Sequence, residues 1–259
     1  MHILLPPSEG KRSGGRGRSL TAHPDAGPLA LARTAALDSL ATLLAGDPDV
    51  AAGALLLPPA VTADALAANA VVRTSPTTAA LSRYAGVVYD GLAYGTLSHG
   101  ARLLARRSVY IFSGLFGVVR GDENVPLYRV PAKAVLPRLG VAGTYWRPIL
   151  SDLLPNLLGR GLIIDLRSND YASMWRPDKA IRERVVSVRI LSPTPTGTRA
   201  VISYPSKFGK GRLAGALLET LAGGTPITCP QDVADAWISC GGAAYELTGP
   251  GQLDLFAVQ

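Results

Sequence analysis

A lysine follows a short apolar segment near the start of the chain. Residues 3–5 are Ile-Leu-Leu, which predicts a buried strand, and the loop from Ser8 to Arg12 contains Lys11. A lysine at a strand end can bind phosphate, and its amine can act as a nucleophile or base once it is removed from water. A solvated loop lysine is the alternative. The segment is not a Walker loop, because the pattern G-x-x-x-x-G-K-[ST] is absent. Lys11, with Ser8 and Arg12 beside it, is therefore a candidate phosphate-binding or catalytic group.

A second basic segment contains three cations and two glycines. Lys207, Lys210 and Arg212 alternate with Gly209 and Gly211, between a predicted strand and a predicted helix. Backbone N–H groups at the start of a helix attract anions, and neighbouring cations add to that attraction. The segment predicts a loop that binds a phosphate or carboxylate group.

Polar residues also follow the apolar run over residues 162–166. Ser168, Asn169 and Tyr171 come at its end, where open α/β sheets place their ligands. Turn and capping roles are the alternative for Ser168 and Asn169. We expect Ser168 to bind phosphate, and Asn169 and Tyr171 to join Lys11 if the site is catalytic.

Two arginines extend the candidate phosphate site. The run over residues 111–120 contains Gly114 and Gly117, which allow a backbone to approach a ligand closely, and it ends at Arg120. Arg129 follows soon after, in the sequence Pro-Leu-Tyr-Arg. Both arginines are candidate phosphate ligands.

The charge of the chain favours an acidic partner. Lysine and arginine number 26 against 19 acidic residues, a net charge of +7, and only five of the 26 are lysines. The planar guanidinium suits phosphate geometry and keeps its charge at all physiological pH values. An arginine-rich, basic chain is typical of nucleic-acid binders, although a GC-rich genome also produces an arginine bias.

Several classes of protein are excluded by composition. No apolar run reaches the roughly 18 residues of a membrane span, and the N-terminus lacks the pattern of a signal peptide, so we expect a cytoplasmic protein without membrane contact. Two cysteines, Cys229 and Cys240, form no disulfide framework. The histidines His2, His23 and His99 are far apart, so we expect neither a bound metal nor a cofactor. The oligomeric state is left open.

The hydrophobic patterns predict a mixed α/β fold in one domain, residues 1–259, with a curved mixed sheet flanked by helices and a C-terminal hairpin. Helices are expected over residues 28–45, 62–72, 211–221 and from Thr77. Strands are expected over residues 109–112, 162–166, 185–191 and 199–204, and the hairpin over residues 246–248 and 253–258.

Six motifs in this order resemble the YaaA family. They are Ser8 to Lys11, Val88 to Leu92, Ser113 to Val118, Pro126 to Arg129, Asp165 to Tyr171 and the basic segment Lys207 to Arg212. The aromatic pair Tyr145-Trp146 lies between the fourth and the fifth of them. The resemblance covers residues 1 to about 220. This chain departs from the family pattern at Asp165, where asparagine is common, and at Phe116, where tyrosine is common.

The resemblance implies a cytoplasmic protein that limits oxidative damage under peroxide stress, through effects on free iron. It also implies binding of duplex or branched DNA in a basic cleft, with a helix-hairpin-helix element. The best candidate for that element is a helix ending near Leu221, the turn from Ala222 to Pro226 and a helix from Gln231 to Trp237, although this turn lacks a basic residue.

Two functions follow from these observations. The first is DNA binding without sequence preference, and the arginine excess and the resemblance make it the principal hypothesis. The second is an enzyme acting on a nucleotide or another phosphorylated small molecule. The enzyme requires its candidate groups to converge in one pocket: Lys11, Arg129, Asn169, Tyr171, Lys207 and Arg212. An enclosed pocket would favour the enzyme, and a broad cleft lined by arginine would favour DNA binding.

Overall fold

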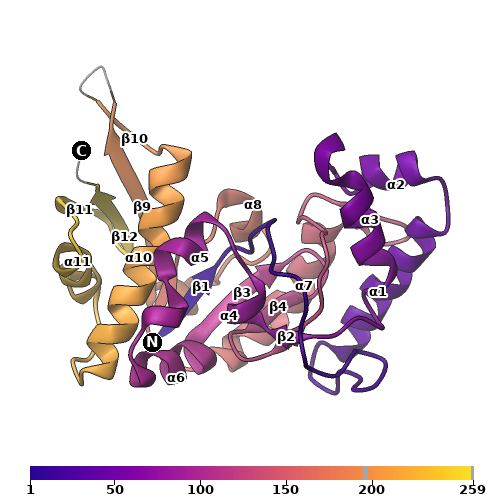
Figure 1. Cartoon of the computed structure of the whole chain (residues 1–259). Helices are drawn as coiled ribbons and strands as arrows, with labels where there is room; N and C mark the ends of the chain where they lie inside the picture. Colours follow the sequence, from indigo (N-terminus) through magenta and orange to yellow (C-terminus); the bar gives the residue numbers. More distant parts are fainter. Residues whose placement is uncertain (195–197, 258–259) are drawn as a thin grey trace.

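The computed structural model describes residues 1–194 and 198–257 and has a mixed α/β fold, as the sequence predicts. Within these residues the main sheet has eight strands (Figure 1). They are β1 (His2–Leu5), β3 (Val109–Ser113), β4 (Gly117–Arg120), β8 (Ile163–Asp165), β9 (Val185–Pro193), β10 (Arg199–Ala200), β11 (Ala244–Gly249) and β12 (Gln252–Phe256). Two short ladders complete the set: β2 (Thr78–Ala79) with β5 (Asn124–Val125), and β6 (Val135–Leu136) with β7 (Gly140–Val141).

The centre of the sheet is parallel. The strand order is β11-β12-β9-β8-β1-β3-β4, and the strands from β12 to β3 run in the same direction, whereas β11 and β4 are antiparallel edges. Strands β1 and β3 are continuous apolar runs because helices cover both faces of a parallel sheet. The chain starts at β1, continues to β3 on one side and later returns to β8 on the other. The carboxyl end of β1 is therefore the point where the strand order reverses.

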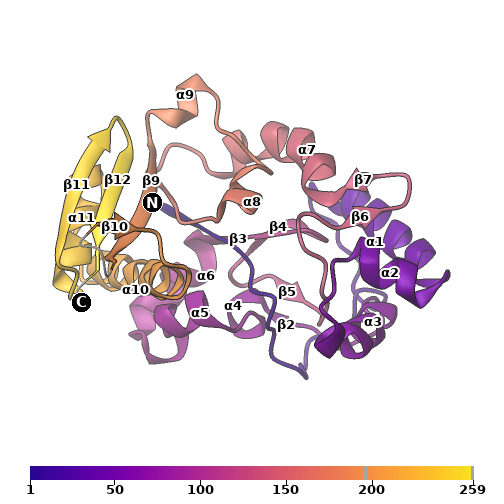
Figure 2. The same ribbon diagram turned by 90° about the horizontal axis from the view of Figure 1, so that it is seen from above.

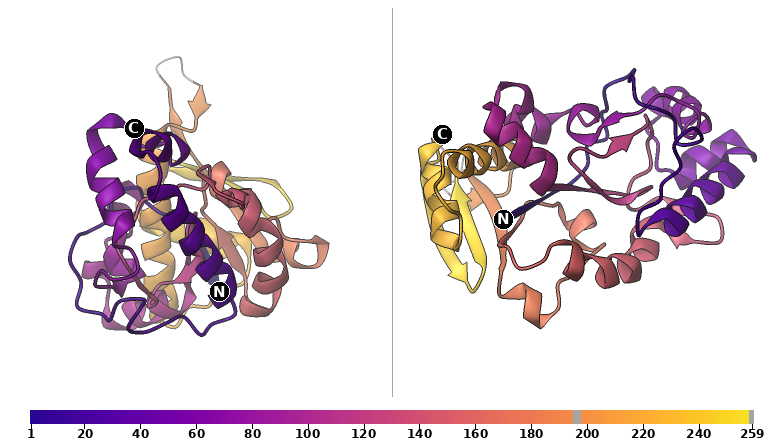
Figure 3. Two further views of the ribbon diagram at one scale, coloured as in Figure 1. Left: turned by 90° about the vertical axis from the view of Figure 1, so that its right-hand side faces the viewer. Right: turned by 90° about the horizontal axis from the view of Figure 1, so that it is seen from below.

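Helices lie on both sides of the sheet (Figure 2). One side carries α4 (Ala80–Arg83), α5 (Val87–Leu92), α6 (His99–Ser108) and α10 (Ser203–Ala222), and the other carries α7 (Ala142–Leu157), α8 (Asn169–Ala172) and α9 (Lys179–Arg182). Helices α1 (Ala30–Leu44), α2 (Pro48–Ala54) and α3 (Thr62–Ala70) gather at one end, opposite α11 (Pro230–Ser239) and the β11–β12 hairpin (Figure 3). The short turns η1 (Pro59–Val61) and η2 (Tyr94–Thr96) connect neighbouring helices.

Most predicted elements are present with small shifts of their ends. Helices α1 and α3 and strands β1, β3, β8 and β9 confirm the predicted ones, and α10 and α11 flank the predicted turn. The C-terminal hairpin is present as β11 and β12, although Val258 lies outside the described residues. Among those residues no single helix is long and apolar enough to cross a membrane; Pro48–Ala54 and Pro59–Ala70, bent by 113°, meet the length and composition criteria only as a pair.

Two predicted elements are wrong. The helix expected from Thr77 begins only at Ala80, because Thr78 and Ala79 pair with β5. The strand expected over residues 199–204 ends at Ala200, and the chain turns into α10 at Ser203. Val201 and Ile202 are β-branched residues of the kind that favours a strand. In the structure their side chains are exposed and lie between β10 and α10, so they do not belong to a buried strand.

The prediction that the basic segment forms a loop is also wrong, because Lys207, Lys210 and Arg212 all lie inside α10. The glycines between them serve helix packing. A Cβ at Gly211 would lie 1.8 Å from the carbonyl oxygen of Val88 in α5. The spacing of these glycines therefore permits two helix backbones to touch and does not form a phosphate-binding turn.

Candidate functional site

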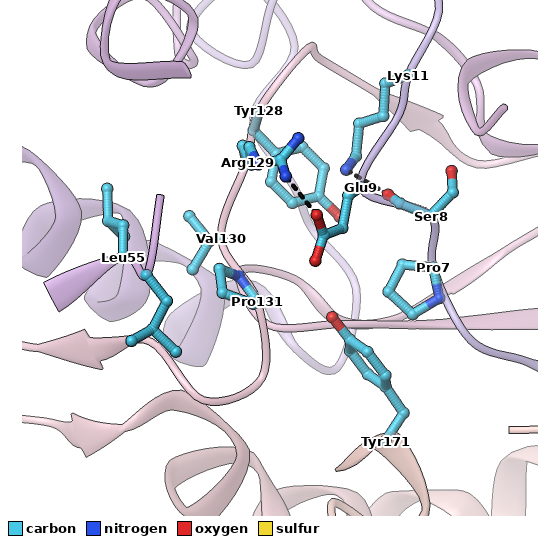
Figure 4. Close-up of a pocket in the computed structure, with 11 residues that line it drawn as sticks. Pro7, Ser8, Glu9, Lys11, Leu55, Tyr128, Arg129, Val130, Pro131 and Tyr171 are labelled. Atoms are coloured by element: carbon cyan, nitrogen blue, oxygen red, sulfur yellow. Dashed lines mark hydrogen bonds and ion pairs between the residues drawn. The ribbon is translucent and has the colours of Figure 1, made fainter. Parts of the chain in front are cut away.

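One pocket lies beyond the carboxyl ends of the neighbouring parallel strands β1 and β8, and Figure 4 shows the side chains that line it. The loop after β1 supplies one wall, residues 128–131 supply another, and Tyr171 of α8 comes from the chain beyond β8. The lining residues are Pro7, Ser8, Glu9, Lys11, Leu55, Leu56, Tyr128, Arg129, Val130, Pro131 and Tyr171. The pocket therefore lies where open α/β sheets bind their ligands.

A buried arginine holds the loop that carries Lys11. The guanidinium of Arg83 is fully buried and donates to four carbonyl oxygens, those of Arg12, Gly14, Pro76 and Val125. Backbone bonds add to this, because Arg12 N–H donates to Arg83 O at 2.8 Å. The segment after Lys11 is therefore tied at several points to the body of the protein.

Ser8 closes the same loop on the other side of Lys11. Its hydroxyl donates to Gly10 O and accepts the N–H of Ala85 at 3.1 Å. The N–H of Ala85 also donates to Gly10 O at 3.1 Å. These bonds make Ser8 a residue that shapes the loop, in addition to lining the pocket.

The amine of Lys11 lies between two aromatic rings. Its Nζ is 4.4 Å from the ring centroid of Tyr128 and 5.2 Å from that of Tyr84, and it donates to Ser8 O at 2.9 Å. No ion pair joins it to a carboxylate among the described residues. Burial of the amine lowers the pKa of Lys11 to about 7, with the positive charge of Arg129 acting in the same direction and Glu9 against it. Lys11 can consequently exist in both protonation states near neutral pH.

The two tyrosines belong to a chain of hydroxyl groups. Ser113 Oγ lies 2.6 Å from Tyr128 Oη, which lies 2.5 Å from Tyr84 Oη. Ser113 Oγ also accepts the N–H groups of Leu115 and Phe116, so its own hydrogen is free for Tyr128. Burial raises the pKa of Tyr128 to about 12, and the pKa of Tyr84 is also raised. These hydrogen-bonded hydroxyl groups hold both tyrosine rings against Lys11, and both tyrosines remain protonated at neutral pH.

An ion pair lies at the mouth of the pocket. Arg129 donates to the carboxylate of Glu9, whose side chain is 71% exposed, while that of Arg129 is 20% exposed. Tyr171 points its hydroxyl toward the pair from the opposite wall (Figure 4). Burial raises the pKa of Tyr171 well above its ordinary value, so its hydroxyl remains a hydrogen-bond donor at neutral pH. The carboxylate of Glu9 thus neutralises the guanidinium of Arg129 at the mouth of the pocket.

The structure brings together only part of the predicted site. Lys11, Arg129, Tyr171 and Ser8 line one pocket. Ser168 and Asn169 are exposed at the start of α8, and neither lines the pocket. Ser168 occupies the N-cap position of this helix, but its side chain forms no capping hydrogen bond. The side chain of Arg12 is exposed, and Arg12 does not line the pocket.

The remaining basic candidates lie elsewhere. Arg120 is at the far end of β4 and pairs with Asp122 at 2.6 Å. Lys210 is part-buried and donates to Arg167 O at 2.9 Å, and Lys207 is exposed on α10. Arg212 donates to Gly241 O at 3.2 Å and lies over the Trp237 ring. The convergence predicted for Lys207 and Arg212 with Lys11 is therefore wrong, because α10 carries both of them outside the pocket.

Sequence reasoning missed four residues that build the site: Glu9, Tyr84, Ser113 and Tyr128. A signal was present for three of them, because Glu9, Ser113 and Tyr128 lie in motifs that carry the resemblance, whereas Tyr84 lies just before the Val88 to Leu92 motif. Their roles depend on pairs 15, 44 and 120 positions apart, in the Ser113–Tyr128, Tyr84–Tyr128 and Glu9–Arg129 contacts. Spacing along the chain does not reveal such pairs.

The arrangement suits acid–base or nucleophilic chemistry on an anionic ligand. Lys11 supplies an amine that can lose its proton, Arg129 a cation and Tyr171 a hydroxyl donor. Among the described residues no group of three or more His, Cys, Asp or Glu side chains could hold a metal ion.

Known proteins are similar to this chain over most of its length. The family model for peroxide stress protein YaaA matches residues 1–224. The UPF0246 protein SCO2297 of Streptomyces coelicolor is 38% identical over 237 residues, which cover 91% of this chain and 88% of that protein. The UPF0246 protein CE1889 of Corynebacterium efficiens is 38% identical over 226 residues, and Cgl1995/cg2186 of Corynebacterium glutamicum is 36% identical over 222 residues, each covering 84% of both chains.

Proposed function

Because the chain belongs to the YaaA family of peroxide stress proteins, we propose that it protects the cytoplasm against peroxide by acting on a phosphate-bearing small molecule in the Lys11 pocket. A nucleotide or another phosphorylated metabolite is the class of ligand. The supporting observation is the meeting of Lys11, Arg129 and Tyr171 at the strand ends where the sheet order reverses. A protein that only binds DNA has no need of an amine enclosed between two tyrosine rings.

Each group has a distinct role in this proposal. Arg129 binds the phosphate, since its guanidinium can form two parallel hydrogen bonds to it. Tyr171 donates a third hydrogen bond from the opposite wall. Lys11 acts as the acid–base group or nucleophile, because its pKa of about 7 places both forms of the amine within reach at neutral pH.

We expect Glu9→Gln to raise the affinity for inorganic phosphate about three- to ten-fold. The carboxylate of Glu9 occupies Arg129 and repels an incoming anion, and the amide removes the charge while keeping the shape. Isothermal titration calorimetry with inorganic phosphate measures the change. Glu246→Gln, which removes an equal charge from the exposed edge strand β11, is the control and should leave the affinity within two-fold. Equal affinities in Glu9→Gln and the parent protein would mean that phosphate does not bind at Arg129.

DNA binding is the second candidate, and a specific group of side chains favours it. Arg12, Arg16 and Arg18 are exposed on the loop that begins at the Lys11 pocket, and no ion pair involves them within the described residues. Thr77 fixes this loop, since its hydroxyl donates to Arg18 O and its backbone pairs with Gly17. A fixed row of arginines can contact successive phosphates of duplex or branched DNA without reading bases. In this candidate α10, α11 and the turn between them remain the proposed helix-hairpin-helix element.

If the loop with Arg12, Arg16 and Arg18 binds DNA, the loss of these arginines should weaken the salt dependence of DNA binding. Replacing Arg12, Arg16 and Arg18 by alanine should reduce the slope of log K against log salt by about two to three, which is roughly 0.9 for each phosphate that the variant no longer neutralises. Fluorescence anisotropy with a labelled duplex measures this slope. A matched variant replaces three exposed arginines elsewhere: Arg106, Arg107 and Arg160. If the affinity falls equally in both variants, the net charge rather than this loop attracts DNA, and the loop is not the interface.

A further inference from the structure

A polar groove lies outside the Lys11 pocket, on the face of the sheet opposite α10. The space within it, including the part open to solvent, is about 640 Å³. The segment with α9 lines one side, the tip of the β11–β12 hairpin lines the other, and the neighbouring strands β8 and β9 contribute Asp165, Val185 and Ser187. This face of β9 carries the exposed Ser187 and Arg189, whereas Val186 and Val188 are buried on the other face.

The floor of the groove is a row of three polar residues on adjacent strands. Asp165 of β8 is the register partner of Ser187 in β9, and Ser187 is the register partner of Gln252 in β12. Register partners in neighbouring strands project to the same face of a sheet. A carboxylate, a hydroxyl and an amide therefore lie side by side, and all three line the groove.

The charge of the groove is positive. Arg176 and Arg182 line it, both residues are exposed, and neither forms an ion pair within the described part of the chain. Asp165 does not neutralise them, because both of its oxygens are bound by Arg167, at 2.8 Å and 2.6 Å. Two guanidinium groups next to neutral hydrogen-bonding side chains are suited to an anion of at least two negative charges.

The hairpin wall is fixed before any ligand binds. Ser187 N–H donates to Gly251 O at 2.8 Å. Gly251 has φ +69°, and a Cβ there would lie 2.4 Å from Val185 O, so only glycine fits so close to β9. The groove is thus a formed surface with a polar floor and a rigid wall.

We propose that this groove is a second anion-binding site, for a small molecule that bears a phosphate group or several carboxylates. Arg176 and Arg182 bind the anionic groups, and Ser187 and Gln252 bond neutral hydroxyl or carbonyl groups of the same molecule. The site stands apart from the Lys11 pocket, so it does not depend on the function proposed there.

Titrations with pyrophosphate and citrate, followed by NMR on the full-length protein, test this site and distinguish the two kinds of anion. We expect amide shifts at Arg176, Arg182, Ser187 and Gln252 with at least one of the probes. The double variant Arg176→Gln/Arg182→Gln should bind that probe about ten-fold or more weakly, because two charge-assisted hydrogen-bonding groups are removed. Lys179→Gln is the matched control, since Lys179 is an exposed cation on the same helix that does not line the groove, and it should change the affinity less than two-fold.

Two results would overturn the proposal. One is the absence of shifts in the groove with both probes. The other is an equal weakening in Lys179→Gln, which would show that α9 attracts anions only through its overall charge. A Lys11→Met variant that keeps the groove shifts would confirm that the two sites are separate.

Discussion

Replacing Lys11 by methionine should make the protein more stable and at the same time inactive. The amine lies between two tyrosine rings without a carboxylate partner, so its charged form is poorly solvated. Methionine fills a similar volume without that cost, and we expect a gain of about 1–2 kcal/mol in the free energy of unfolding at pH 6. Survival of peroxide treatment should fall to that of cells lacking the protein. A gain in stability with a loss of function is the signature of a residue kept for chemistry.

The gain should depend on pH in a defined direction. The pKa of Lys11 is about 7 in the folded protein, against an ordinary value of 10.5. Between these values the unfolded chain carries a proton that the folded protein has released, so this amine makes stability rise as the pH rises from about 7 to 10.5. Lys11→Met removes that contribution, and its advantage over the parent should shrink across the same window.

Chemical denaturation at pH 6, 8 and 10 measures both effects. Lys207→Met, at an exposed lysine of α10, is the control and should leave the stability within about 0.5 kcal/mol. If Lys11→Met is less stable than the parent protein at every pH, Lys11 is a structural residue and the argument from its burial fails.

Gly211→Ala should lower the free energy of unfolding by about 3 kcal/mol, the upper end of the usual cost of overpacking. Its Cβ would lie 1.8 Å from Val88 O and 2.6 Å from Leu92 N, which are backbone atoms of α5. Across the same contact, a Cβ at Gly91 of α5 would lie 2.1 Å from Phe208 O in α10. The two helices can relieve this overlap only by moving apart.

A glycine in another helix provides the control. Gly53 lies within α2, and a Cβ there would meet nothing within 4 Å. Gly53→Ala should therefore raise stability by roughly 0.5–1 kcal/mol, because alanine loses less backbone entropy in a helix. Urea denaturation of both variants makes the comparison. A Gly211→Ala protein as stable as the parent would show that α5 and α10 are not in backbone contact.

The sequence predicted the sheet and the place of Lys11 because both depend on local patterns. An apolar run such as residues 109–112 identifies its strand, and a polar loop after residues 3–5 identifies a strand end. The basic segment around Gly211 was misjudged for the same reason. Glycines between cations look like an anion-binding turn, and only the contact with α5, more than 100 positions away in the chain, shows that they serve helix packing.

The partners of Lys11 were beyond local reasoning. Tyr84, Ser113 and Tyr128 come from three separate segments and meet only after the sheet has formed. Glu9 is a neighbour of Lys11 in sequence, yet its pairing with Arg129 depends on how the chain returns 120 positions later. The charge pattern marked the basic residues as candidate phosphate ligands, but the fold decides which of them line a pocket and which are exposed elsewhere.

Survival of peroxide treatment by cells whose only copy carries Lys11→Arg tests the central claim most directly. Arginine keeps the positive charge and binds phosphate well, but it cannot lose its proton at physiological pH. Lys11→Met serves as the inactive reference and Lys207→Arg as the matched control, and the DNA affinity of each purified protein is measured alongside. If the amine of Lys11 must be able to lose its proton, Lys11→Arg fails to protect the cells although its DNA affinity is retained. Full protection by Lys11→Arg would contradict the account and leave DNA binding as the function of the site.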